Sequence, residues 1–285
     1  MRKFVCTLLA LCLAASMAAC AGSTTTESSA ASDSSVASES SVSETSTVSE
    51  TSSEEDTASE ESGEASGEVL SYDEYMAAEL DSEVTTIQAY VQAKQSYYAE
   101  QGTATVYLQD KDGGYFAYDM KCSQEDYDAM TEGTCIQVTG FKSEWSGEIE
   151  IMDGQLDSIV EGDTFVAEPL DVTEMLGTDE LESHQNEKVA FKGLTVEAST
   201  DANGNEAAFL YNYDGSGADG DDLYFNVSYN GQTYTFTVES YLCDNTTEVY
   251  KAVTALEVGQ TIDCEGFLYW YEGVNPHITS VTVAQ

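Results

Sequence analysis

The sequence predicts a mainly β protein in which two similar β-domains follow one another along the chain. The first observation is an internal repeat, because residues 133–141 (GTCIQVTGF) return as residues 259–267 (GQTIDCEGF) with Gly, Ile, Gly and Phe in register. The second is the alternation of apolar and polar residues over short segments separated by turn residues, which is typical of half-buried strands. The third is a change in composition near residue 68, where a polar segment without aromatic residues gives way to a sequence rich in Tyr.

Residues 1–19 have the features of an export signal. Arg2 and Lys3 precede an apolar segment, residues 4–15, that is short for a membrane-spanning helix. The segment ends in Ser-Met-Ala-Ala before Cys20, and this ending resembles the lipobox of bacterial lipoproteins, with Met17 where Leu is usual. The resemblance implies cleavage before Cys20, acylation of Cys20 (palmitate included), and an anchor at the extracellular side of the cell membrane. In a two-membrane organism the outer membrane is the alternative location, and an ordinary secretory signal cut nearby is the alternative signal.

Residues 20–68 are expected to form a disordered stalk behind the lipid anchor. From residue 21 onward they are almost all Ser, Thr, Ala, Glu and Asp, without a single Lys or Arg. Such a segment buries too little apolar surface to offset the entropy lost on ordering.

The charge balance is strongly acidic. After removal of residues 1–19, seven Lys, no Arg and 53 acidic residues remain, which gives a net charge of −46. Nucleic-acid binding normally depends on Lys and Arg that replace phosphate counterions. On this ground nucleic acid is not expected as a partner.

Residues 69–162 are expected to form the first domain. Asp112-Gly-Gly indicates a hairpin and Ser123 a helix N-cap. The expected elements, in order, are a short helix within 69–81, strands at 84–93, 103–109 and 115–120, a helix at 123–130, the repeat strand, and a strand that begins at 148.

Residues 163–285 are expected to form the second domain, after a connector with a short helix near 172–176. The expected strands are 188–197, 206–213, 223–229 and 233–241, then a helix at 246–256 and strands at 261–271 and 277–283. Asn230-Gly231 is a strong signal for a two-residue hairpin. This count is one strand more than in the first domain, so the second domain has either an extra hairpin or a split third strand.

The order strand, strand, strand, helix, strand, strand resembles the OB-fold, a five-stranded Greek-key barrel with its helix between strands three and four. The resemblance implies two tandem OB-like barrels, each with a short helix between strands three and four, behind the stalk. It also implies nucleic-acid binding as an alternative function, although a fold by itself does not determine function.

Each domain contains two cysteines, which makes Cys122 with Cys135 and Cys243 with Cys264 candidate disulfides. Side chains along a strand alternate between its faces. Cys264 is in phase with Ile262 and fits a small core residue, whereas Cys135 is out of phase with Ile136 and is expected to point outward.

The sequence shows no catalytic cluster, and the protein is predicted not to be an enzyme. His184 and His277 are the two histidines, and no metal-hydrolase, serine-hydrolase or thioredoxin-like spacing occurs. No cofactor is expected, with calcium as the one alternative, because Asp214, Asp219, Asp221 and Asp222 form an oxygen-rich segment. Solvated turns explain the same residues.

All eighteen Tyr and both Trp follow residue 68. OB barrels present a sheet face on which sugars or bases stack, although Tyr and Trp are also ordinary strand residues. The candidate stacking residues are Tyr115, Tyr118, Trp145, Tyr224, Trp270 and Tyr271.

The sequence therefore predicts a non-enzymatic lipoprotein of the cell envelope that binds or scaffolds a glycan, peptide or protein ligand. The alternatives are an OB-fold nucleic-acid-binding protein and a calcium-dependent adhesion module. Contact with the membrane is expected only through the lipid.

Overall fold

The computed structural model describes residues 68–82 and 84–284, so the predictions for the leader, for Cys20 and for the stalk up to residue 67 lie outside the described residues. The described chain is mainly β, as predicted. No helix within it is long and apolar enough to cross a bilayer.

The first sheet closes into a five-stranded barrel. Its strand order is β2-β3-β4-β6-β5, and β5 pairs again with β2. All neighbours are antiparallel except β4 and β6, which run parallel. The barrel strands are β2 (Val84–Lys94), β3 (Thr103–Gln109), β4 (Gly114–Lys121), β5 (Thr134–Trp145) and β6 (Glu148–Thr164). The short strand β1 (Val69–Leu70) pairs with β2 outside this ring.

Two short helices accompany this sheet. Helix α1 (Tyr72–Ala77) begins at a capping box in which the Ser71 hydroxyl and the Glu74 carboxylate bond each other's backbone N–H. Helix α2 (Gln124–Ala129) lies between β4 and β5 and begins at Ser123, whose side chain accepts from the Asp126 N–H, as predicted.

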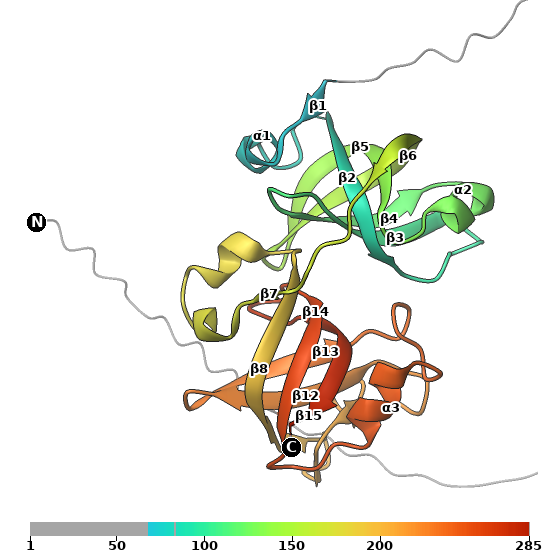
Figure 1. The fold of residues 1–285 in the computed structure, drawn as a ribbon. Coiled ribbons are helices and arrows are strands. Elements are labelled where there is room, and N and C mark those ends of the chain that lie inside the picture. The colour runs from blue at the N-terminus through green and yellow to red at the C-terminus, as the bar shows by residue number, and fades with distance from the viewer. Residues whose placement is uncertain (1–67, 83, 285) are drawn as a thin grey trace, which may run out of the picture. The chain divides into compact units, whose positions relative to one another are not determined.

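The second sheet contains the same ring of pairings, with the order β12-β13-β15-β14-β8 and β8 paired again with β12 (Figure 1). Here too the third and fifth strands of the ring, β13 and β15, run parallel. The ring strands are β8 (Lys188–Glu197), β12 (Leu223–Tyr229), β13 (Gln232–Val238), β14 (Thr261–Phe267) and β15 (His277–Val283).

The remaining elements lie outside this ring. They are β7 (Leu170–Asp171), η1 (Thr173–Met175), η2 (Leu181–His184), β9 (Ser199–Thr200), β10 (Glu206–Ala207), β11 (Leu210–Tyr211) and helix α3 (Glu248–Thr254), between β13 and β14. The predicted strand at 206–213 is wrong. Its first residues pair with β9, and Leu210–Tyr211 add only to the edge of β12.

The repeated sequence has the same backbone role in both sheets. Gly133 and Gly259 each come after a helix, and each has a positive φ (86° and 89°), a conformation that favours glycine. The N–H of Gly133 donates to Val91 O at 2.7 Å, and that of Gly259 donates to Val196 O at 2.8 Å. Each glycine thus ties the start of the fourth ring strand to the first.

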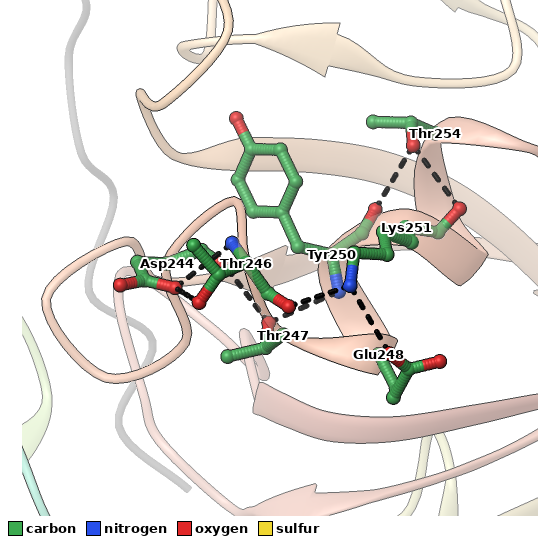
Figure 2. A network of polar contacts seen from close by, with 7 residues as sticks. All are labelled: Asp244, Thr246, Thr247, Glu248, Tyr250, Lys251 and Thr254. Atoms are coloured by element: carbon green, nitrogen blue, oxygen red, sulfur yellow. Dashed lines mark hydrogen bonds and ion pairs between the residues drawn. The ribbon is translucent and has the colours of Figure 1, made fainter.

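Helix α3 is fixed at both ends by local hydrogen bonds (Figure 2). The Thr247 side chain caps the N-terminus by accepting from Tyr250 N–H, and the Thr254 hydroxyl donates to the Tyr250 and Lys251 carbonyls. The Tyr250 hydroxyl accepts from Gly220 N–H and donates to Asp221 O, each at 2.8 Å. Through these two bonds, helix α3 holds in place the loop that contains Gly220 and Asp221.

Each sheet encloses its own hydrophobic core, and a third buried cluster joins the two sheets. This cluster consists of Tyr107 and Phe116 from the first sheet and Phe267 from the second. Tyr107 stacks on Phe267 with ring centroids 4.5 Å apart. We call this contact region between the two sheets the seam.

Candidate functional site: an aromatic cavity at the seam

A cavity of about 1310 Å³ opens where the two sheets meet, and both sheets contribute to its lining. Four carboxylates line it, Asp119, Asp222, Glu239 and Glu272, and no Lys or Arg of the described residues does so. Its aromatic lining comprises Tyr97, Tyr98, Phe116, Tyr118, Trp145, Tyr213, Tyr224, Tyr234, Tyr241, Tyr269 and Tyr271. We call this site the aromatic cavity.

The exposed aromatic side chains of the described residues are concentrated here. Six are more than a third exposed, from Tyr98 and Tyr118 at 44% to Tyr213 at 77%, and all six line the cavity. Large apolar groups gathered on one exposed surface indicate an interaction site, whereas single ones scattered over a surface do not. Besides Tyr98, Tyr118 and Tyr213, the six exposed aromatic residues of the cavity are Trp145, Tyr241 and Tyr271.

Hydrogen bonds cross the seam and link the two sheets beside the cavity. Ser96 N–H donates to Tyr241 O and Glu272 N–H donates to Ser146 O, both at 2.8 Å. Before β8, Gln185 donates from Nε2 to Gly147 O at 2.8 Å and accepts from Ile149 N–H at 2.9 Å. At least one partner in each of these bonds is a backbone group.

His277 lines the cavity at the start of β15 and is 7% exposed. Burial lowers its pKa to about 3, so the ring is neutral. His277 Nδ1 and the Tyr107 hydroxyl share a hydrogen bond at 2.6 Å, and Gln95 Nε2 donates to the same hydroxyl. The hydrogen bonds among the described residues engage only Nδ1 of His277, so its Nε2 has no partner within the described part of the chain.

Asp222 and Glu239 form the acidic end of the cavity. Asp222 Oδ1 accepts from the Ser240 N–H and hydroxyl, and Glu239 Oε2 accepts from Leu242 N–H. Burial, and secondly the charge of Asp222, raise the pKa of Glu239 to about 7. Burial and the same two carboxylates raise the pKa of Tyr224 to about 12. None of the ion pairs among the described residues involves Asp222 or Glu239.

Glu148 is buried at the seam next to this cavity, with 0% exposure. Its Oε2 accepts from Trp270 N–H at 2.8 Å, while Oε1 has no hydrogen-bond partner among the described residues. Burial raises the pKa of Glu148 well above its ordinary value, and the hydrogen bond from Trp270 N–H opposes the shift only in part. Burial thus favours the neutral form of this carboxyl group in the folded protein.

The structure brings four of the six predicted stacking residues together in the cavity: Tyr118, Trp145, Tyr224 and Tyr271. Trp145 packs on Tyr271 across the seam with ring centroids 5.1 Å apart. Tyr115 does not fit the prediction, because it is 1% exposed and packs inside the first barrel against Tyr72 and Tyr75 of α1. Trp270 packs partly buried against the second core.

The sequence reasoning missed Tyr97, Tyr98, Tyr213 and Tyr241, which lie between strands, and it treated His277 as incidental. The adjacent Tyr97-Tyr98 pair is the one local signal that could have drawn attention to its loop. His277 carries no such signal, because its role depends on a hydrogen bond to a residue 170 positions away.

The candidate disulfides do not form in the structure, where Cys122, Cys135, Cys243 and Cys264 are free. The expectation that Cys135 points outward is wrong, since it is 3% exposed. The β5–β6 register shifts between Thr134 and Cys135, and this irregularity breaks the simple alternation. Cys264 is 1% exposed and belongs to the second core, as its phase predicted.

The predicted calcium loop does not assemble either. No group of three or more potential metal ligands occurs among residues 68–82 and 84–284. Each carboxylate has a separate partner: Asp214 accepts from Ser216 N–H, Asp219 from Asn245, Asp221 from Ala218 N–H, and Asp222 from Ser240. These are turn and capping contacts, which is the alternative explanation of the same residues. His184 lies apart from them, 3.2 Å from Glu187.

Comparison with known proteins gives structural matches alone. No family model matches the chain, and no curated protein matches its sequence. A murine DNA-binding protein bound to double-stranded DNA matches at 10% identity and a TM-score of 0.34, covering 70% of this chain and 96% of that one. The Ifi202 HINa domain with a 20-bp double-stranded DNA matches at 11% identity and a TM-score of 0.31, covering 70% and 95%. The p202 HIN1 domain with a 12-mer double-stranded DNA matches at 13% identity and a TM-score of 0.29, covering 70% and 92%.

These matches correct one expectation from the sequence. Nucleic acid was not expected as a partner because of the net charge, but all three of these matched structures are DNA complexes. Net charge describes the whole chain, whereas an interface depends on a local surface. The exclusion of nucleic acid is therefore withdrawn.

Proposed function

We propose that this chain is a non-enzymatic binding module that holds ring-bearing ligands in the aromatic cavity, with a glycan as the first candidate. We further infer that both sheets are OB-like barrels in tandem, since each ring has the strand order one-two-three-five-four with a helix between strands three and four. The observation that carries the proposed function is that the six exposed aromatic side chains of the described residues all line this cavity.

A glycan suits the chemistry of this lining. Nine tyrosines and one tryptophan offer flat apolar faces for the sugar rings, and the tyrosine hydroxyls and His277 Nε2 offer hydrogen bonds for the sugar hydroxyls. The volume of about 1310 Å³ is larger than a typical drug-sized pocket, so it can take an oligosaccharide.

Single-stranded nucleic acid is the second candidate, because bases stack on the same aromatic faces. In that case stacking would dominate within the cavity, since its lining carries four carboxylates and no Lys or Arg of the described residues. A weak dependence of affinity on salt is then expected, in contrast to binding driven by phosphate contacts.

We also propose a location of the protein in the cell. The lipobox-like ending before Cys20 supports a lipoprotein at the cell envelope, anchored by acyl chains, with a stalk between the anchor and the folded part.

The test is calorimetric titration of the full chain with neutral oligosaccharides from bacterial cell walls and, separately, with single-stranded oligonucleotides at two salt concentrations. The informative variant is Trp145→Ala, because Trp145 is 52% exposed and faces Tyr271. We expect loss of a stacking ring to weaken binding about tenfold, in the range of about 1–3 kcal/mol for such contacts.

Trp145→Phe is the matched control, since it keeps a flat ring at the same position and should retain most of the affinity. Binding of neither class of ligand, or equal affinity in the Ala and Phe variants, would contradict the proposed function.

A further inference from the structure

The carboxylates of the aromatic cavity lack a countercharge within the described part of the chain. Four acidic side chains line the cavity without Lys or Arg, and the ion pairs given by the structure lie elsewhere. Charges taken partly out of water are costly unless an opposite charge accompanies them. A positively charged ligand would provide the countercharge that the cavity lining lacks.

Asp222 and Glu239 are the two acids best placed for such a ligand. The Asp222 charge contributes to the raised pKa of Glu239, which means that the two carboxylates repel each other. Both also raise the pKa of Tyr224, which places this phenol within their field. The hydrogen bonds given by the structure engage Oδ1 of Asp222 and Oε2 of Glu239.

The aromatic lining has the same preference for positive charge. A cation is attracted to the face of Tyr or Trp by the quadrupole of the ring, and the attraction grows when water is excluded. Tyr213 and Tyr271 contribute to the raised pKa of Tyr224, so they lie close to the acidic end. Nε2 of the buried His277, which lines the cavity without a hydrogen-bond partner among the described residues, is an independent feature that indicates a polar ligand such as one with hydroxyl groups.

We propose that the aromatic cavity binds glycans that carry a protonated amine, with the ammonium group at Asp222 and Glu239 and the sugar rings on the exposed aromatic side chains. This inference rests on the proposed function and names its ligand class, an aminosugar oligomer.

The test compares two probes that differ only in the amine. The full chain is titrated near neutral pH with a glucosamine tetrasaccharide and with the matched N-acetylglucosamine tetrasaccharide, in which acetylation removes the charge. We expect the free-amine oligomer to bind at least tenfold more tightly. Glu239→Gln and Asp222→Asn should each lower that affinity at least fivefold and reduce the difference in affinity between the free-amine and acetylated oligomers.

The chain has a formal charge of −44 and would attract any polycation weakly, so a control of equal charge is needed. Glu257→Gln removes one charge from an exposed residue that does not line the cavity. If Glu257→Gln weakens binding as much as Glu239→Gln, the attraction comes from net charge and the proposal is overturned. Circular dichroism confirms that each variant is folded.

The remaining outcomes separate the two proposals. Equal affinity for the two tetrasaccharides would overturn the aminosugar inference and leave the glycan-binding function standing, whereas failure of both to bind would overturn the two together. The diamine putrescine tests the role of the rings. If it competes as strongly as the glucosamine oligomer, the sugar part of the proposal is wrong.

Discussion

Replacing Glu148 with Gln should stabilise the protein at neutral pH and have little effect in acid. Glu148 is fully buried and its pKa is raised, so the folded state keeps the carboxyl proton to a higher pH than the unfolded chain, which ionises with a pKa near 4.5. Between pH 4.5 and the raised pKa the folded state therefore binds more protons, and its contribution to stability is lost as the pH rises. Gln is neutral throughout and keeps an oxygen that can accept from Trp270 N–H.

The magnitude follows from the pH interval. Each pH unit by which the folded-state pKa exceeds the unfolded value near 4.5 costs about 1.36 kcal/mol, and the interval up to pH 7 limits the cost at that pH to about 3 kcal/mol. Glu148→Gln should thus raise the free energy of unfolding by up to about 3 kcal/mol at pH 7 and by close to nothing at pH 4.5. Because many more surface carboxylates titrate in the same interval, the difference between variant and parent is the quantity to compare.

Urea unfolding followed by tryptophan fluorescence is a suitable assay, since the backbone N–H of Trp270 donates to Glu148 and Trp145 also lies at the seam. Glu257→Gln, on the surface, should stay within about 0.5 kcal/mol of the parent at both pH values. A variant that is destabilised at pH 7, or one whose effect does not change with pH, would refute the assignment of a neutral buried Glu148.

Three further outcomes are expected. Gly266→Ala should destabilise the protein by more than about 3 kcal/mol in the same urea assay, because a Cβ there would lie 2.2 Å from His277 O on the paired strand. A loss of unfolding free energy below about 1 kcal/mol would show that β14 and β15 can separate. Tyr107→Phe should cost about 1–3 kcal/mol and weaken ligand binding, since it leaves His277 Nδ1 without its hydrogen-bond partner. Unchanged stability would contradict the hydrogen bond. Cys20→Ala should abolish incorporation of radiolabelled palmitate in a bacterial host, and continued labelling would rule out the lipobox interpretation.

Much of the fold could be predicted because its signals are local. The strands Thr103–Gln109, Lys188–Glu197 and His277–Val283 have the predicted bounds, since alternation and flanking turn residues mark them. The strand at 206–213 was wrong because its apolar residues pair only with a sheet edge. Alternation could not place Cys135, where an irregular register intervenes.

The candidate site was harder to predict, because it exists only where two sheets meet. Alternation shows that Tyr115 and Tyr118 occupy strand β4, but not that α1 covers Tyr115 while Tyr118 remains exposed. The tyrosines in loops, such as Tyr213 and Tyr241, have no periodicity from which a face could be assigned. Their convergence depends on contacts between residues more than a hundred positions apart, such as Ser96 with Tyr241.

The seam has a consequence for how this protein can evolve. Its cross-links from Ser96 to Tyr241 and from Glu272 to Ser146 use backbone N–H and carbonyl groups, which nearly every amino acid possesses. Substitution of the side chains around the cavity therefore leaves these links intact. Related chains can therefore exchange one cavity-lining residue for another and acquire new ligands while keeping the same scaffold. Sequence diversity among relatives should be greatest in the cavity lining and smallest at Gly140 and Gly266, where there is no room for a side chain.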